Sequence, residues 1–254
     1  VEVDTETTKT RGITVNQLGI NVFAFCMNVF GGLALFVLGM KLMSNGLTSV
    51  AGEKMRTLLQ LFSKNKFVGV IAGALVTAVL QSSSATTVMV IGFINAGLLN
   101  LTQSLGIVFG ANIGTTITAQ IIAFDISSII MPSIIVGMVM TFFSKKVLRG
   151  WGDTILGFGL LFFGMGLMSA ELKGVAQFPS FMEVFRVFDC APNSSGIMPL
   201  GSVIGTIGIG IVVTVIIQSS SAATGIVLAL GASGLINFYT AVILVLGSNI
   251  GTTV

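Results

Sequence analysis

The chain has 254 residues, of which 54% are hydrophobic and only 8% are charged, whereas soluble domains average about 25% charged residues. Residues 54–124 and 190–254 contain no carboxylate at all, and the net charge of +3 comes from lysines and arginines in the expected loops. This composition excludes an ordinary soluble protein and gives no sign of nucleic-acid binding. It predicts an all-α integral membrane protein, because charged side chains are costly inside a bilayer.

The first half of the chain predicts three kinds of element. Residues 1–20 form a polar N-terminal segment, and the first repeat, 21–125, opens with an apolar lead helix. Two short apolar runs over 67–99 then meet at a polar tip beginning QSSS; each run is too short to span a bilayer alone, so we expect a re-entrant helical hairpin. Residues 101–124 have the length of a span but contain GANIGTT, which predicts a broken helix.

The second half repeats this order after a connection. Residues 126–154 are expected to form a connecting transmembrane helix and a basic loop. The second repeat, 155–254, then has a hairpin over 197–236 with a second QSSS tip, and a broken helix over 238–254 containing GSNIGTT. Because the first copy continues past the position equivalent to Val254, we expect the native protein to continue as well.

The two halves are copies of one another. Residues 81–116 and 218–253 align without a gap at an offset of 137 and agree at 17 of 36 positions. The lead helices share a GM-LMS pattern at Gly39–Ser44 and Gly164–Ser169, at an offset of 125. The second copy has therefore gained 12 residues, which we place in the polar loop near 171–195, where insertions are tolerated.

The number of membrane crossings orients the copies. If each hairpin leaves and returns on one side, three crossings separate corresponding points, so the repeats have inverted topology. The basic residues near 54–66 and 145–149 then share one side, opposite the loop at 171–195. The positive-inside bias makes that first side cytoplasmic.

The QSSS tips suit ion binding. Ser82, Ser83, Ser84, Thr86 and Thr87 with Gln81 form an uncharged polar cluster, and Gln218, Ser219, Ser220, Ser221 and Thr224 repeat it. A hydroxyl both donates and accepts hydrogen bonds, so the same serines suit an oxyanion or a sodium ion. Serines that start an outgoing half-helix also expose free backbone N–H groups to an anion. The alternative is structural, with hydroxyls that bond the preceding helical turn.

The two glycine-asparagine signatures have the same ambiguity. Their glycines permit unwinding, and their side chains offer neutral oxygens to a hard cation: Asn112, Thr115, Thr116, Asn249, Thr252 and Thr253. The alternative is close helix packing through small residues. Neither repeated block contains a carboxylate or histidine, so coupling to a cation is a more natural interpretation than a proton relay.

Two QSSS stretches, each followed by a G-(A/S)-N-I-G-T-T signature, resemble the type II sodium-dependent phosphate cotransporter family, over most of the chain from about residue 30. The resemblance implies sodium-driven uptake of inorganic phosphate. By position it implies phosphate ligands at Ser82–Ser84 and Ser219–Ser221, and sodium ligands at Gln81, Thr87, Asn112, Gln218, Thr224 and Asn249. We group Thr86 with the phosphate ligands, and Thr115, Thr116, Thr252 and Thr253 with the sodium ligands.

These features predict a multi-pass protein of the inner cell membrane that works by alternating access and is not an enzyme. A membrane-embedded phosphate sensor and a sodium-coupled carrier of another small anion stay open as alternatives. No cofactor other than the co-transported Na+ is expected. A homodimer is compatible with this interpretation, as is a phosphate-regulator-like helical domain after Val254, which some bacterial members carry.

Overall fold

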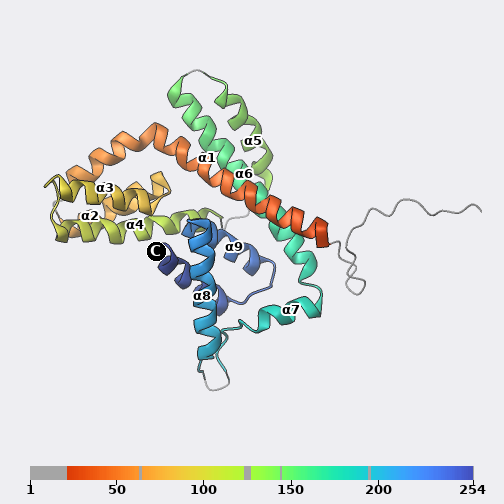
Figure 1. The fold of residues 1–254 in the computed structure, drawn as a ribbon. Coiled ribbons are helices and arrows are strands. Elements are labelled where there is room, and N and C mark those ends of the chain that lie inside the picture. The colour runs from red at the N-terminus through yellow and green to blue at the C-terminus, as the bar shows by residue number, and fades with distance from the viewer. Residues whose placement is uncertain (1–21, 63–64, 123–126, 144, 194–195, 254) are drawn as a thin grey trace, which may run out of the picture.

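The computed structural model describes residues 22–62, 65–122, 127–143, 145–193 and 196–253 (Figure 1). The expected polar segment 1–20 lies outside these residues. All regular elements in the described part of the chain are α-helices, which confirms the all-α class. The helices are α1 (Val22–Phe62), α2 (Lys66–Leu80), α3 (Ser83–Asn95), α4 (Leu101–Ile122), α5 (Ser127–Thr141), α6 (Lys146–Val175), α7 (Pro179–Arg186), α8 (Leu200–Ile217), α9 (Ser220–Ala232) and α10 (Phe238–Gly251).

The helix boundaries repeat at the sequence offset of 137 residues. α2 and α8 each end at a glutamine, and α3 and α9 are each 13 residues long and capped by a serine. α4 follows Asn100, whose side chain accepts from the N–H of Gln103 at 2.9 Å, and α10 follows Asn237, which accepts from Thr240 at 2.8 Å. These side chains satisfy backbone donors that the helix itself leaves unpaired.

The lead helices α1 and α6 form an antiparallel pair, which Figure 1 shows crossing the centre of the molecule. A Cβ atom added at Gly32 would lie 2.7 Å from the carbonyl oxygen of Gly164, and one added at Gly39 would lie 2.6 Å from that of Gly157. Only glycine permits this approach. The contact is reciprocal, because Gly32 is equivalent to Gly157 and Gly39 to Gly164.

In the first copy α2 and α4 run parallel in close contact, and in the second copy α8 and α10 do the same. A Cβ added at Gly110 of α4 would collide with the carbonyl oxygen of Val70 in α2. The equivalent Cβ, at Gly247 of α10, would collide with the carbonyl oxygen of Ile207 in α8. α4 therefore packs on α2 in the same register in which α10 packs on α8.

The prediction of broken helices was wrong for the described residues. α4 is one continuous helix through GANIGTT, and α10 continues through GSNIG to Gly251. The reason is the packing just described: the glycines let α4 and α10 approach their neighbours, and none of them unwinds its helix.

Two predicted connections are also helical. Residues 51–62 continue α1, and the expected basic loop forms the first turns of α6, where Lys146, Arg149 and Asp153 lie. Between them, α5 has only 15 residues, shorter than the span predicted over 126–143. A helix that projects beyond the apolar layer can carry charged residues. Charged residues in the sequence therefore did not distinguish a loop from the end of a helix.

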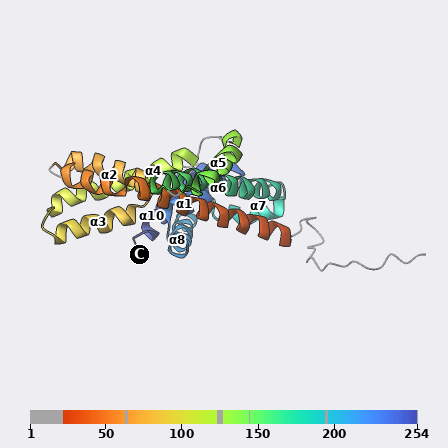
Figure 2. The same ribbon diagram turned by 90° about the horizontal axis from the view of Figure 1, so that it is seen from above.

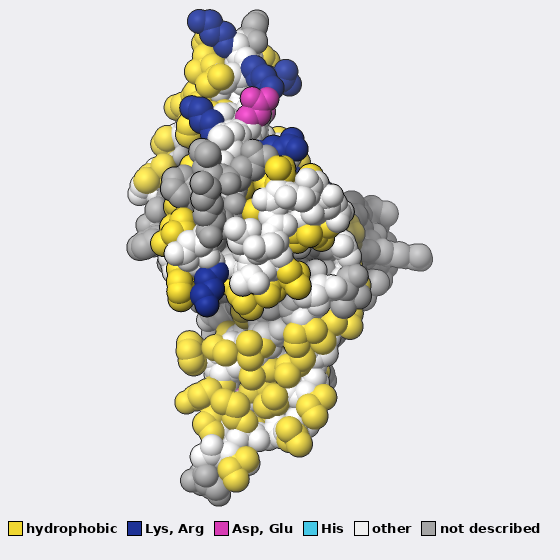
Figure 3. All heavy atoms as spheres, turned by 90° about the vertical axis from the view of Figure 1, so that its left-hand side faces the viewer, with side chains coloured by type: hydrophobic (Ala, Val, Ile, Leu, Met, Phe, Trp, Pro, Cys, Tyr) yellow, Lys and Arg dark blue, Asp and Glu magenta, His cyan; other side chains and the backbone are white. Residues whose placement is uncertain are grey.

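The apolar surface agrees with a membrane protein. Three described helices, α1, α6 and α8, are long and apolar enough to cross a bilayer. α8 runs nearly perpendicular to α2 and α4 in Figure 1, and Figure 2 views it almost end-on. In Figure 3 hydrophobic side chains cover the lower part of the face shown, over α8, where no charged side chain is seen, and the basic side chains lie in the middle and upper parts among further hydrophobic ones. The lower part therefore has the uncharged apolar surface expected of a segment that contacts lipid.

Candidate functional site

Each QSSS tip is a tight turn between two helices. Gln81 closes α2 in the left-handed conformation (φ 56°, ψ 24°), and its N–H donates to the carbonyl of Thr77 at 2.7 Å. Ser82 then caps α3, its hydroxyl accepting from the N–H of Ala85 at 3.1 Å. The second tip is the same: Gln218 has φ 58° and ψ 28°, and Ser219 accepts from Ala222 at 3.2 Å.

The two glutamines are the non-glycine residues with positive φ in the described part of the chain. A side chain in this region costs about 1–2 kcal/mol, which is why glycine or asparagine usually stands there. Each amide nitrogen turns back onto its own helix, Gln81 to the carbonyl of Ala78 and Gln218 to that of Val215 at 2.7 Å. The glutamines thus shape the turns.

The two tips face one cavity of about 580 Å³, which we call the hydroxyl cavity. Its walls are α3 and α4 from the first copy and α9 and α10 from the second. No charged side chain is among the described residues that line it. They are Ser83, Ser84, Thr87, Val88, Val108, Asn112, Thr115, Thr116, Ala119, Ser220, Ser221, Thr224, Val245, Asn249, Thr252 and Thr253.

Most of these residues form equivalent pairs. Every predicted ligand that lines the cavity from the first copy is matched there by the residue 137 positions later, from Ser83 with Ser220 to Thr116 with Thr253. Even the apolar Val108 is matched by Val245. The cavity therefore lies where the two copies meet, and each copy contributes the same set of predicted ligands.

Five predicted ligands do not line the cavity. Gln81 and Gln218 form the turns, and Ser82 and Ser219 use their hydroxyls as helix caps. Thr86 is fully buried between α2 and α3, where its hydroxyl accepts from that of Thr77 at 2.9 Å and donates to the carbonyl of Ser82 at 3.1 Å. The structure thus places these five residues in turns, caps and a buried contact, outside the lining of the cavity.

Five threonines that line the cavity donate their hydroxyl hydrogens to backbone carbonyls one turn earlier. Thr115 donates to the carbonyl of Ala111 at 3.1 Å, Thr252 to that of Ser248 at 2.9 Å, and Thr224 to that of Ser220 at 2.8 Å. Thr116 and Thr253 also donate to carbonyls three residues earlier, both at 2.7 Å. A hydroxyl whose hydrogen is used in this way offers only acceptor capacity, which suits a cation.

The serines of the cavity are positioned for the opposite charge. Ser83 and Ser84 are the first residues of α3, and Ser220 and Ser221 the first of α9. Backbone N–H groups in a first helical turn have no partner within the helix, and the positive end of the helix dipole lies there. The cavity therefore combines two helix N-termini with hydroxyl donors, an arrangement suited to an oxyanion.

Sequence reasoning missed the buried hydroxyls behind the tips. Thr77 donates to Thr86, whereas its equivalent Thr214 donates to the hydroxyl of Ser248 at 2.9 Å. All four residues are buried. The signal was a threonine four residues before each glutamine, in TAVLQ and TVIIQ.

Comparison with known families identifies the family of the chain. The model of the Na+/Pi-cotransporter family matches residues 35–170 and 200–254, which contain most of both lead helices and all residues of the hydroxyl cavity. The chain belongs to this family. It is a family of transporters and not of enzymes. Between the two matched ranges, the unmatched residues 171–199 contain α7 and the loop in which the extra residues were predicted.

Individual relatives extend the comparison. The protein YqeW of Bacillus subtilis, named as uncharacterized, is 33% identical over 227 residues, which are 89% of this chain and 70% of YqeW. The putative inorganic phosphate export protein YjbB of Salmonella typhimurium is 31% identical over 227 residues, 89% of this chain but only 40% of YjbB. The human sodium-dependent phosphate transport protein 2B is 35% identical over 100 residues, 37% of this chain and 14% of that protein. No solved structure matches the chain.

Proposed function

We propose that this chain is the transport unit of a sodium-coupled carrier of inorganic phosphate, with substrate and ions bound in the hydroxyl cavity near the membrane midplane. The observation that carries the proposal is the pairing of equivalent residues from two copies around one uncharged polar cavity. Membership of the Na+/Pi-cotransporter family supplies the substrate and the coupling ion.

The proposed roles follow the hydrogen bonds. Phosphate binds between the N-termini of α3 and α9, where Ser83, Ser84, Ser220 and Ser221 donate. Sodium binds to the oxygens of Thr87, Asn112, Thr115 and Thr116 and of their counterparts Thr224, Asn249, Thr252 and Thr253. No basic side chain of the described residues lines the cavity, so sodium compensates the charge of the phosphate. Sodium binding before phosphate follows from this need.

The inverted topology is supported by the lead helices. α1 and α6 are antiparallel, and each contact between them is exchanged when every residue is replaced by its counterpart: Gly32 with Gly164 becomes Gly157 with Gly39. Such reciprocity is the property of a two-fold axis. An axis that relates antiparallel spanning helices lies in the membrane plane, as in carriers built from inverted repeats.

The short helices support re-entrant hairpins. α3 and α9, at 13 residues, are about 20 Å long, less than the apolar thickness of about 30 Å. A buried tip is tolerated there because it lines a polar cavity. We retain 21–125 and 155–254 as the two repeats, joined through 126–154, in a multi-pass protein of the inner cell membrane with the basic ends cytoplasmic.

The test is uptake of radiolabelled phosphate into proteoliposomes under an inward sodium gradient. We expect sodium-dependent uptake by the wild type and its loss in the double variant Ser83→Ala/Ser220→Ala. The control is Thr57→Ala/Thr141→Ala, which likewise removes two helical hydroxyls, but at positions outside the cavity. Phosphate binding without any flux would favour the sensor.

Two further measurements define substrate and direction. Competition by excess sulfate or citrate that equals competition by phosphate would indicate another small anion. Because YjbB is named a putative exporter, efflux from phosphate-loaded vesicles should also be measured with the sodium gradient reversed. For a carrier coupled to sodium, the direction of flux follows the gradient.

A further inference from the structure

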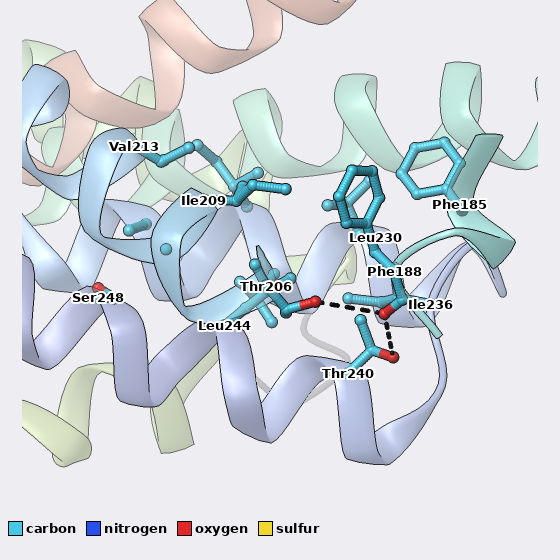
Figure 4. Close-up of a pocket in the computed structure, with 14 residues that line it drawn as sticks. Phe185, Phe188, Thr206, Ile209, Val213, Leu230, Ile236, Thr240, Leu244 and Ser248 are labelled. Atoms are coloured by element: carbon cyan, nitrogen blue, oxygen red, sulfur yellow. Dashed lines mark hydrogen bonds between the residues drawn. The ribbon is translucent and has the colours of Figure 1, made fainter. Parts of the chain in front are cut away.

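A second cavity, of about 180 Å³, lies beside α9 on a different face from the hydroxyl cavity; we call it the apolar cavity (Figure 4). Ala223, Val227 and Leu230 of α9 form one wall, and α8 and α10 form the others. Phe185 and Phe188, from the segment unmatched by the family model, also line it. The cavity thus belongs to the second copy and depends on the residues that this copy has gained.

The wall after α7 is held in place by hydrogen bonds. Thr206 of α8 and Thr240 of α10 both donate to the carbonyl of Phe188, at 3.4 and 3.2 Å (Figure 4). Ser202 donates to the carbonyl of Val187 at 3.3 Å, and the N–H of Cys190 donates to Thr240 at 3.1 Å. These bonds connect the segment to both helices.

The same bonds leave the cavity without free polar groups. The hydroxyl hydrogens of Thr206 and Thr240 are used on Phe188, and Ser248 is paired with Thr214. A buried water needs about two to four polar partners, and apolar cavities of roughly 150 Å³ stay dry and accept small hydrocarbons. The chemistry of the lining therefore selects hydrocarbon.

The first copy shows the size of the group that fits. Leu230 is equivalent to Phe93 and Ile226 to Met89, and the first copy is filled there: Phe93 is 3% exposed within a core of α2, α3 and α4. Leu230 is smaller than Phe93 at the same depth, whereas Ile226 and Met89 have similar volumes. The second copy therefore lacks the ring that fills this space in the first copy, and an apolar cavity of about 180 Å³ lies there.

The cavity also has a route to the bilayer. Ile209, which lines it, is 36% exposed and continues into the outer apolar face of α8, where Ile204 is 61% and Val212 is 56% exposed. In a membrane that face meets lipid tails. The hydrocarbon available in excess at this opening is an acyl chain.

We propose that the apolar cavity binds the end of a membrane lipid's acyl chain, which completes the packing behind α9. This helix presents Ser220, Ser221 and Thr224 to the hydroxyl cavity. The lipid site itself does not rest on the proposed transport. Its consequence, that lipid fixes one half of the ion site, does.

The first test counts retained lipids. Protein transferred from phosphatidylcholine bilayers into detergent is examined by native mass spectrometry. We expect the wild type to retain one lipid more than Leu230→Phe, which fills the cavity with the residue of the first copy. Val227→Phe, which adds a ring on the same wall of the cavity, is the second filling variant, in case the first fails to fold. Ile204→Phe is the matched control, because it adds similar bulk on the exposed face. Equal retention by wild type and both filling variants would overturn the proposal.

The second test separates lipid from free hydrocarbon. Benzene added to the detergent-purified, delipidated protein should raise its unfolding temperature by about 2–4 °C relative to Leu230→Phe. Stabilisation by benzene with no lipid difference would show a cavity that takes free hydrocarbon only, and would contradict the lipid assignment. Neither readout uses phosphate or sodium, so failure of the proposed transport would leave both tests intact.

Discussion

The α2–α3 and α8–α9 units present equivalent residues to the hydroxyl cavity but differ behind it. In the first copy the buried Thr77 bonds Thr86, so that α2 and α3 are connected to each other. In the second copy Thr214 bonds Ser248 of α10, and the position of Thr86 is occupied by Ala223. Both copies keep the buried threonine hydroxyl, but its hydrogen-bond partner lies on α3 in the first copy and on α10 in the second.

The filling of the two copies differs in the same way. Phe93 and its neighbours fill the space between α2, α3 and α4, whereas the apolar cavity occupies the corresponding space in the second copy. Residues that face an ion are limited by the chemistry of that ion. Residues behind them need only satisfy buried groups and fill volume, and several solutions exist.

The largest loss of stability is expected from substitutions at the glycines through which both copies pack their helices in the same way. Gly110→Ala and Gly247→Ala each push a methyl group into a carbonyl of the neighbouring helix, so each should lower the free energy of unfolding by about 3 kcal/mol. Thermal unfolding in detergent measures this. Gly92→Ala and Gly205→Ala are the controls, because nothing lies within 4 Å of a Cβ at either position. Similar losses in the controls would mean that helix contact is not the cause.

The next largest loss of stability is expected at the buried threonine hydroxyls, whose hydrogen-bond partner differs between the two copies. Thr86→Ala leaves the buried hydroxyl of Thr77 without its partner, and Ser248→Ala does the same to Thr214. Each should cost about 2 kcal/mol of stability. Thr86→Ala/Ala111→Ser transplants the arrangement of the second copy into the first and should recover most of the loss. If the double variant does not regain stability, the two hydrogen-bond arrangements are not interchangeable.

At the cavity itself the copies should respond equally. Asn112→Ala and Asn249→Ala each remove a carbonyl oxygen from the hydroxyl cavity, and we expect each to raise the sodium concentration for half-maximal uptake by about tenfold, or ~1.4 kcal/mol. Asn28→Ala, which loses an exposed hydrogen bond to Glu171, is the control. Effects that differ strongly between the two asparagines would break the proposed equivalence.

The smallest effect on stability is expected from substitutions that change how completely side chains fill the space behind the hydroxyl cavity. Phe93→Leu gives the first copy the smaller residue of the second and should cost about 1 kcal/mol through the space it opens. Leu230→Phe should not destabilise the detergent-solubilised protein, because the apolar cavity accepts the added ring. Unfolding temperatures of the pair measure both. Destabilisation by Leu230→Phe would show that the cavity is too small for the ring.

The sequence predicted the helical class, the two tips and most residues of the hydroxyl cavity, because a polar block between apolar runs is a local signal. It misjudged Gly110 and Gly114, since a glycine that unwinds a helix and one that receives a neighbouring helix look alike until α2 is in place. It also could not separate Ser82, a cap, from Ser83 in the cavity, because one residue changes the direction of a side chain. The homodimer and the C-terminal domain stay predictions.

The reciprocal contact between α1 and α6 has a consequence for the origin of the chain. Gly32 meets Gly164 as Gly157 meets Gly39, so a protein half this length, carrying one copy alone, could meet a second molecule of itself through the same four glycines. Duplication and fusion of such a gene would turn an interface between subunits into the centre of one subunit. Once joined, the two halves were free to differ, as the exchanged partners of Thr77 and Thr214 illustrate.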